Sequence, residues 1–173
     1  ELESKETSVT IWPATELFGN RIDVPGDISS SVYFAAAGLI LPNSEVLIKN
    51  VGINPTRAGL IKVCEAMGAD LTLLNEDHEN AEPTADLLVR TSSLRGCVIE
   101  GYIIPTLIDE LPTIAMMACF AEGTTVIRDA AELKVKESNR IAIMVENLRA
   151  MGADVEETED GMIIHGGKPL HGA

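Results

Sequence analysis

The chain has 173 residues, of which 46% are hydrophobic but only 3% aromatic, so it is long enough to bury an aliphatic core. Its formal net charge of −14 argues against nonspecific binding to nucleic acid or to an anionic membrane surface. No apolar run approaches the length that spans a membrane.

The cysteines, Cys64, Cys97 and Cys119, are odd in number and form no CxxC pair. Cys64 and Cys119 fall in apolar, helix-like segments, where a free cysteine behaves as a small hydrophobe. The histidines share no ligand spacing. We therefore expect a reduced, cytoplasmic protein without a metal site.

Residues 1–20 contain a candidate strand at 8–12 and are typical of the tail of a preceding unit. Residues 21–95 predict the order strand, helix, strand, helix, strand, strand. Asp27 or Ser29 can cap the first helix, and Asn54 the second, with Pro55 at its first position. The expected ranges are 21–24, 28–41, 45–51, 55–68, 69–74 and 85–91, with a polar loop at 75–83.

Residues 96–173 repeat this order. Glu-Ala-Met-Gly-Ala-Asp at 65–70 recurs as Arg-Ala-Met-Gly-Ala-Asp at 149–154, a shift of 84 residues. Helices that alternate with strands at this spacing indicate an α/β protein of two consecutive βαβαββ units. The expected ranges in the second unit are 97–104, 110–121, 124–128, 137–151, 154–157 and 162–165, with a hairpin turn at 159–161.

The most informative segment is Lys-Val-Lys-Glu-Ser-Asn-Arg at 134–140. It follows a predicted strand and leads into a predicted helix, and the amino end of a helix favours an anion. Lys136 and Arg140, four residues apart, would share one helix face with Glu137 beside them. The spacing alone is also typical of solvated surface charge.

Four segments resemble the enolpyruvyl transferase family, and within it the EPSP synthase branch. They occur in that family's order and span nearly the whole chain. The matching segments are Val-Pro-Gly-Asp-Ile-Ser-Ser-Ser at 24–31, Asn-Pro-Thr-Arg-Ala-Gly at 54–59, Leu-Ile-Asp-Glu-Leu-Pro at 107–112, and 123–141 around the charged run. The resemblance implies a pair of domains, each of three βαβαββ units, of which this chain supplies two consecutive units of one domain.

The reaction that this resemblance implies transfers the enolpyruvyl group of phosphoenolpyruvate to the 5-hydroxyl of shikimate 3-phosphate and releases phosphate, without a metal or cofactor. Asp109 matches the carboxylate that contacts the shikimate hydroxyls and accepts a proton. Glu137 matches the proton donor to the methylene group. Lys136 matches a lysine that binds shikimate 3-phosphate, and Arg140 an arginine that binds phosphoenolpyruvate. From spacing alone, Asp109 could equally be a helix cap and the others surface charges.

The chain departs from the family pattern at two positions. Glu132 stands where some members carry an asparagine that touches shikimate 3-phosphate, which puts a binding role there in doubt. Asn139 stands where others have aspartate, and we expect this change to be neutral. Ser29 and Arg57 lie at helix starts and could touch a ligand, although capping and packing explain them as well.

The family also needs segments that this sequence lacks: an amino-terminal Lys-Ser segment, an Asp-His-Arg motif and a lysine nearer the carboxyl end. We therefore expect a partial domain whose partner is the remaining part of the same enzyme chain, and which is inactive by itself. Two alternatives stay open, a UDP-N-acetylglucosamine enolpyruvyl transferase and a non-catalytic βαβαββ module.

Overall fold

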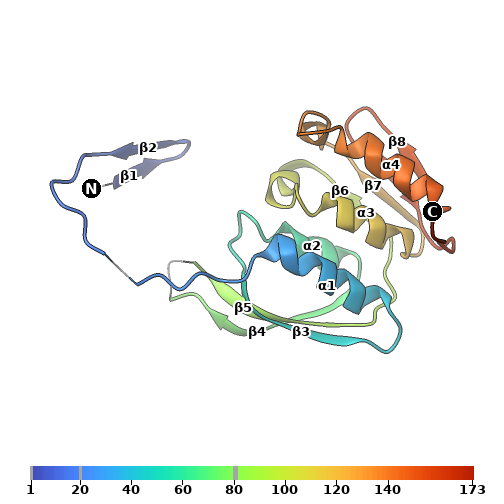
Figure 1. The fold of residues 1–173 in the computed structure, drawn as a ribbon, viewed down its shortest axis with the longest axis horizontal. Helices are drawn as coiled ribbons and strands as arrows, with labels where there is room; N and C mark the ends of the chain where they lie inside the picture. Colours follow the sequence, from blue (N-terminus) through green and yellow to red (C-terminus); the bar gives the residue numbers. More distant parts are fainter. Residues whose placement is uncertain (1, 20, 80–81) are drawn as a thin grey trace.

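The computed structural model consists of two α/β units and an amino-terminal hairpin (Figure 1). It describes residues 2–19, 21–79 and 82–173. In chain order the elements are β1 (Leu2–Lys5), β2 (Ser8–Ile11), α1 (Ile28–Ile40), β3 (Glu45–Gly52), α2 (Gly59–Ala66), β4 (Asp70–Asp77), β5 (Thr84–Arg90), β6 (Val98–Ile99), the 3-10 helix η1 (Gly101–Thr106), α3 (Leu111–Cys119), β7 (Thr124–Ile127), the 3-10 helix η2 (Ala131–Lys134), α4 (Arg140–Ala150), β8 (Asp154–Glu157) and β9 (Met162–His165).

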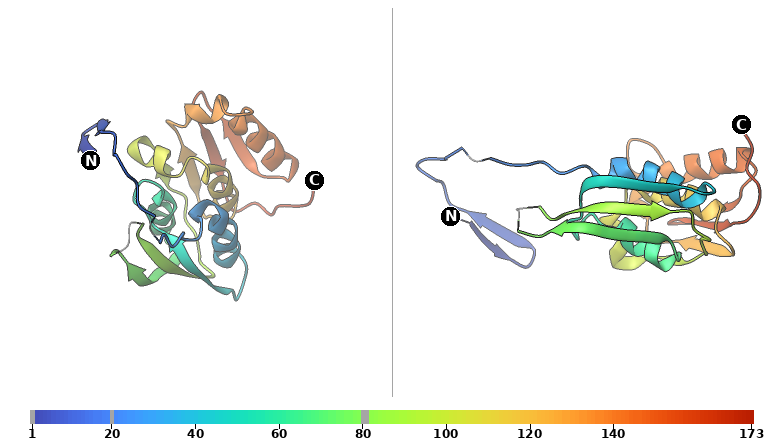
Figure 2. Two further views of the ribbon diagram at one scale, coloured as in Figure 1. Left: turned by 60° about the vertical axis from the view of Figure 1, so that its left-hand side comes forward. Right: turned by 90° about the horizontal axis from the view of Figure 1, so that it is seen from below.

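The first unit is an antiparallel sheet in the order β3-β5-β4 with α1 and α2 on one face. Figure 2 shows its three strands side by side from the open face. Leu47, which alternates along β3 with the partly buried Val46 and Ile48, is 44% exposed. Helix α1 begins where predicted because the Asp27 carboxylate accepts hydrogen bonds from the backbone N–H groups of Ser29 and Ser30.

The second unit repeats this arrangement with the sheet order β6-β7-β9-β8. Strand β6 runs parallel to β7, and the two other pairings are antiparallel. In the first unit, a single parallel bridge between Gly26 and Val51 stands where the β6–β7 pairing stands in the second. The α/β fold of two consecutive βαβαββ units is thus confirmed, with this bridge in place of the first strand of the first unit, although the unit boundaries at 21, 95 and 96 stay a prediction.

The core is aliphatic and continuous across both units, since α1 packs against α3. Leu39, Leu60, Leu111 and Ile141 are fully buried. Every aromatic side chain, by contrast, is at least 45% exposed, and these residues are Trp12, Phe18, Tyr33, Phe34, Tyr102 and Phe120. Aliphatic residues therefore supply the interior, as the composition suggested.

The amino-terminal hairpin pairs β1 with β2 in a sheet of its own and stands apart from both units (Figure 1). The strand expected at 8–12 is confirmed as β2, whereas β1 was not predicted. The apolar side chains here are exposed, Val9 by 61% and Ile11 by 70%. The hairpin adds nothing to the core of the two units.

Two predicted strands are wrong or too long. Residues 21–24 form no strand, and Ile22 and Val24 are 75% and 81% exposed. The strand expected at 97–104 is only β6, because the chain turns at Gly101 (φ 68°) into η1. Gly101 donates its backbone N–H to the Asp129 carboxylate, which holds that turn.

Two predicted helices begin later than expected. Asn54 does not cap α2, because its side-chain oxygen accepts the N–H of Thr56 in a separate turn and α2 starts at Gly59. The helix expected from 137 starts at Arg140, capped by Asn139, whose side chain accepts the N–H of Ala142. Residues 80 and 81 of the predicted 75–83 loop lie outside the described residues, and β4 occupies its start.

No helix in the described part of the chain is both long enough and apolar enough to cross a membrane.

Candidate active site

A pocket of about 510 Å³ opens where the amino ends of α1, α3 and α4 converge. Its lining residues are Ser29, Tyr33, Asp109, Pro112, Glu137, Ser138, Arg140, Ile143 and Met144. Asp109 comes from the turn between η1 and α3, Glu137 from the link between η2 and α4, and Arg140 from the first position of α4. Three of the four predicted site residues therefore share this pocket.

The guanidinium of Arg140 joins the two carboxylates in this pocket. Its Nε and Nη2 donate to the carboxylate oxygens of Glu137 at 2.8 and 3.0 Å, and its Nη1 donates to Asp109 Oδ1 at 3.1 Å. The side chain of Arg140 is 27% exposed, whereas those of Asp109 and Glu137 are 53% and 66% exposed. The planar guanidinium is thus fixed and the carboxylates face solvent.

These contacts set the charge of Glu137. The hydrogen bonds from Arg140 are the main cause that lowers the pKa of Glu137, and the Coulombic attraction of Arg140 and Lys136 acts in the same direction. The same pairing with Glu137 raises the pKa of Arg140. In this arrangement Glu137 is ionised at neutral pH, so it cannot donate a proton while it remains bound to Arg140.

Lys136 is placed differently from the sequence prediction. Its Nζ lies 2.5 Å from Glu132 Oε1, and its side chain is 28% exposed. Lys136 and Arg140 do not share a helix face, because α4 begins only at Arg140. Glu132, the position that departs from the family pattern, therefore neutralises Lys136.

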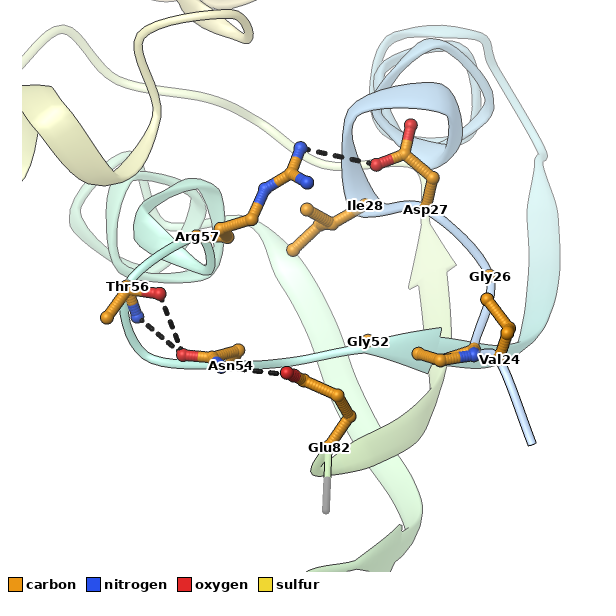
Figure 3. Close-up of a pocket in the computed structure, with 10 residues that line it drawn as sticks. Val24, Gly26, Asp27, Ile28, Gly52, Asn54, Thr56, Arg57 and Glu82 are labelled. Atoms are coloured by element: carbon orange, nitrogen blue, oxygen red, sulfur yellow. Dashed lines mark hydrogen bonds and ion pairs between the residues drawn. The ribbon is translucent and has the colours of Figure 1, made fainter. Parts of the chain in front are cut away.

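The first unit contains a matching pair of charges (Figure 3). Arg57 Nη2 lies 3.3 Å from Asp27 Oδ1, 30 residues earlier, just as Arg140 binds Asp109, 31 residues earlier. This pair borders a pocket of about 430 Å³ that is also lined by Asn54. Asn54 lies three residues before Arg57, where the second unit has Glu137, and its amide binds Thr56 and Glu82.

Glu110 is a residue whose role the sequence interpretation missed. It is only 3% exposed, and its carboxylate accepts a hydrogen bond from Ser29 Oγ. Ser29 Oγ in turn accepts a hydrogen bond from Arg57 Nη2 at 2.9 Å. A charged residue at the head of an otherwise apolar helix was the available signal, since a carboxylate is rarely buried without a partner.

Among the described residues, no group of three or more His, Cys, Asp or Glu side chains is placed to hold a metal ion. The free thiols lie elsewhere in the fold. Burial raises the pKa of Cys64 to about 12 and that of Cys119 to about 11, and it also raises the pKa of Cys97. None of these cysteines lines the pocket around Arg140.

The chain matches known proteins along its whole length. The family model of EPSP synthase (3-phosphoshikimate 1-carboxyvinyltransferase) matches residues 1–173. The 3-phosphoshikimate 1-carboxyvinyltransferase of Bacillus velezensis is 55% identical over 99% of this chain, and that of Geobacter sulfurreducens is 53% identical over 99%. In each case the chain spans 40% of the relative's length.

Solved structures agree with this match. An EPSP synthase structure from Acinetobacter baumannii has a TM-score of 0.91 at 41% identity, and the alignment covers 96% of this chain and 38% of that one. The enolpyruvyl transferase NikO from Streptomyces tendae has a TM-score of 0.61 at 19% identity, over 83% of this chain and 30% of that one, which supports the fold alone. The resemblance drawn from the four sequence segments is confirmed, and the chain belongs to the EPSP synthase family.

Proposed function

We propose that this chain forms part of an enzyme that transfers the enolpyruvyl group of phosphoenolpyruvate to the 5-hydroxyl of shikimate 3-phosphate. The observation that carries the proposal is the contact of one guanidinium, that of Arg140, with both Asp109 and Glu137 in a single pocket. Membership of the EPSP synthase family over all 173 residues supports the choice of reaction.

The two carboxylates suit the proton transfers of an addition followed by an elimination. In the addition, Asp109 would take the proton of the 5-hydroxyl as its oxygen attacks C2 of phosphoenolpyruvate, and Glu137 would give a proton to the methylene carbon. In the elimination, Glu137 would take a proton back from the methyl group as the C2–O bond to phosphate breaks, and Asp109 would give its proton to the departing phosphate. Two carboxyl groups in different environments can hold different protonation states.

Arg140 would link substrate binding to the protonation of Glu137. Its guanidinium suits bidentate binding of an anion, but in this structure it is bound to Glu137 and Asp109. When phosphoenolpyruvate binds the guanidinium of Arg140 in place of Glu137, Glu137 loses the hydrogen bonds that lower its pKa. The arriving anion would then raise the pKa of Glu137 and favour the protonated form that the addition requires.

Lys136 would bind the phosphate of shikimate 3-phosphate. For this its ammonium group must exchange the Glu132 carboxylate for the phosphate. Glu132 would thus compete with the substrate for Lys136 and would not bind the substrate itself.

The partner of this chain would be the remaining part of a longer enzyme chain. The exposed apolar residues of the hairpin, such as Val9 and Ile11, fit residues 2–11 to a preceding unit rather than to the two units described. A cytoplasmic location, without cofactor, metal or nucleic acid, is part of the same proposal, and the net charge of −14 is consistent with it.

The test is phosphate release from phosphoenolpyruvate by the full-length enzyme, with shikimate 3-phosphate or UDP-N-acetylglucosamine as acceptor. We expect turnover when shikimate 3-phosphate is the acceptor and none when UDP-N-acetylglucosamine is. The activity should be lost in Glu137→Gln and kept in Glu157→Gln. Glu157 is a suitable control because it binds Lys134 and does not line the pocket. Turnover only with UDP-N-acetylglucosamine would show that the sugar nucleotide, and not shikimate 3-phosphate, is the acceptor. No turnover with either acceptor would favour a non-catalytic module.

A further inference from the structure

We propose that Glu110 is a positioning residue that holds Asp109 in place through a hydrogen bond from Ser29. This inference rests on the proposed function, in which Asp109 accepts the proton of the acceptor hydroxyl. Glu110 follows Asp109 directly, but the two side chains have opposite surroundings. Asp109 is half exposed in the pocket, whereas Glu110 is 3% exposed.

The buried carboxylate of Glu110 is held by one hydrogen bond and lies at a favourable helix end. It accepts a hydrogen bond from Ser29 Oγ, which belongs to the first turn of α1 in the other unit. Glu110 also stands at the amino end of α3, where the helix dipole favours a negative charge. A buried carboxylate without such partners would be strongly unfavourable, so this side chain is confined to the one position where it has them.

The anchor extends into the first unit. Ser29 Oγ accepts a hydrogen bond from Arg57 Nη2 at 2.9 Å and donates one to the Glu110 carboxylate. The hydroxyl of Ser29 therefore acts both as donor and as acceptor. Arg57 is itself held by Asp27 at 3.3 Å. The Asp27–Arg57 pair of the first unit is therefore connected, through Ser29, to the residue next to Asp109. Arg57 would thus support the position of Asp109 without any contact with a ligand.

The backbone transmits this constraint to Asp109. The N–H groups of Glu110 and Leu111 both donate to the carbonyl of Leu107, at 3.0 and 3.1 Å, so Asp109 lies inside a closed turn. The side chain of Asp109 reaches toward Arg140 from this turn. Loss of the Glu110 anchor would let the turn shift, and a displacement of about 1 Å at a reacting group can cost roughly 100-fold in rate.

The experiment compares four variants of the full-length enzyme with shikimate 3-phosphate and phosphoenolpyruvate: Glu110→Ala, Glu110→Gln, Ser29→Ala and the double variant Ser29→Ala/Glu110→Ala. We expect Glu110→Ala to lower kcat by about 10- to 100-fold with little change in KM for phosphoenolpyruvate. Glu110→Gln should restore most of the rate, because its amide oxygen still accepts from Ser29. The double variant should be no slower than Glu110→Ala, since both changes remove the same hydrogen bond.

Thr113→Ala is the control for a loss of stability alone, because Thr113 is a polar residue of α3 that is also buried (6% exposed) and does not line the pocket. It should lower the unfolding temperature without lowering kcat. If Glu110→Ala does not fold, Ser29→Ala removes the hydrogen bond from its other end and carries the test.

The outcomes separate this inference from the proposed function. If the unmodified enzyme turns over and the folded Glu110→Ala variant has an unchanged kcat, the positioning role of Glu110 is wrong while the proposed function stands. An unchanged kcat in Ser29→Ala has the same meaning if Glu110→Ala does not fold. Additive losses in the double variant would overturn the positioning role too, because Ser29 and Glu110 would then act separately. No turnover by the unmodified enzyme would overturn the proposed function and this inference with it.

Discussion

Arg140 Nη1 lies 3.1 Å from Asp109 Oδ1, although 31 residues separate them. This contact ties the turn before α3 to the first residue of α4, and Glu137 completes it from the preceding link. The geometry of the proposed site thus depends on how two helices pack, and each of the following predictions probes one part of that arrangement.

Arg140→Lys should lower kcat/KM of the full-length enzyme by roughly 10- to 100-fold, because an ammonium group cannot keep the bidentate contact that a planar guanidinium makes with a carboxylate. Steady-state kinetics with shikimate 3-phosphate and phosphoenolpyruvate measure this. Arg90→Lys is the matched control, since Arg90 also contacts two carboxylates, Glu45 and Asp70, but on the first sheet. An equal loss in both variants would contradict the prediction.

Gly59→Ala should destabilise the protein by about 1–3 kcal/mol through overpacking. A Cβ at this position would overlap Thr106 Oγ1 and approach Leu107 Cδ2 to 2.8 Å, just before the turn that carries Asp109. Urea unfolding measures the loss, and Gly172→Ala, whose Cβ would meet nothing within 4 Å, should change little. Equal stability of the two variants would show that the α2–η1 contact is loose.

Asn139→Ala should cost about 1 kcal/mol, because the side chain of Asn139 caps α4. Asn139→Asp should keep or improve the stability, since an aspartate can accept the same N–H and interacts favourably with the helix dipole. Thermal unfolding of both variants checks this. A loss in Asn139→Asp as large as that in Asn139→Ala would contradict the capping role.

The ion pair of Asp154 with Lys168, 2.7 Å apart, should stabilise the protein only at pH values where Asp154 is ionised. The hydrogen bond from Lys168 is the main cause that lowers the pKa of Asp154 below its usual value of 3.8. Because the folded-state pKa is the lower one, the contribution is complete above the unfolded pKa and is lost as the pH falls through the folded pKa. Asp154→Asn should therefore be less stable than the unmodified protein at pH 7, and this difference should shrink as the pH falls below the ordinary aspartate pKa of 3.8 and through the lowered pKa of folded Asp154. A constant gap in urea titrations would refute this.

Thiol labelling should distinguish the cysteines. Cys97 is only partly buried, whereas burial raises the pKa of Cys64 to about 12 and that of Cys119 to about 11. Iodoacetamide reacts with thiolates, so we expect slow labelling at Cys97 first and labelling of the others only on unfolding. Mass spectrometry of the native protein checks the order, and early modification of Cys64 would contradict the packing of α2.

The sequence predicted the elements whose apolar residues follow one clear period and whose ends carry a cap or a turn. Strands β3, β5 and β9 and helix α1 are such cases. Strand β1 could not be predicted in this way, because Leu2 is its only apolar residue and its pairing with β2 makes it a strand. The start of α2 was misplaced because an asparagine before a proline can cap either a helix or a tight turn, and Asn54 caps the turn.

For the site, the sequence predicted residue types but not contacts. Asp109, Glu137 and Arg140 come from two segments, and their meeting depends on the packing of α3 against α4. Lys136 was expected beside Arg140, but the late start of α4 leaves it with Glu132. A glutamate at the start of an apolar helix was a local signal for Glu110, but its partner, Ser29, follows only from the contact between α1 and α3.

The duplicated aspartate–arginine pair has a consequence for how the two copies differ. Both copies place a guanidinium against an aspartate at nearly the same sequence spacing, so the repeated fold forms this contact twice. The residue three positions before each arginine is a titratable glutamate in one copy and an amide, Asn54, in the other. An amide neither takes up nor releases a proton near neutral pH, so only the second unit has a titratable side chain at this position, where the proposed reaction needs one.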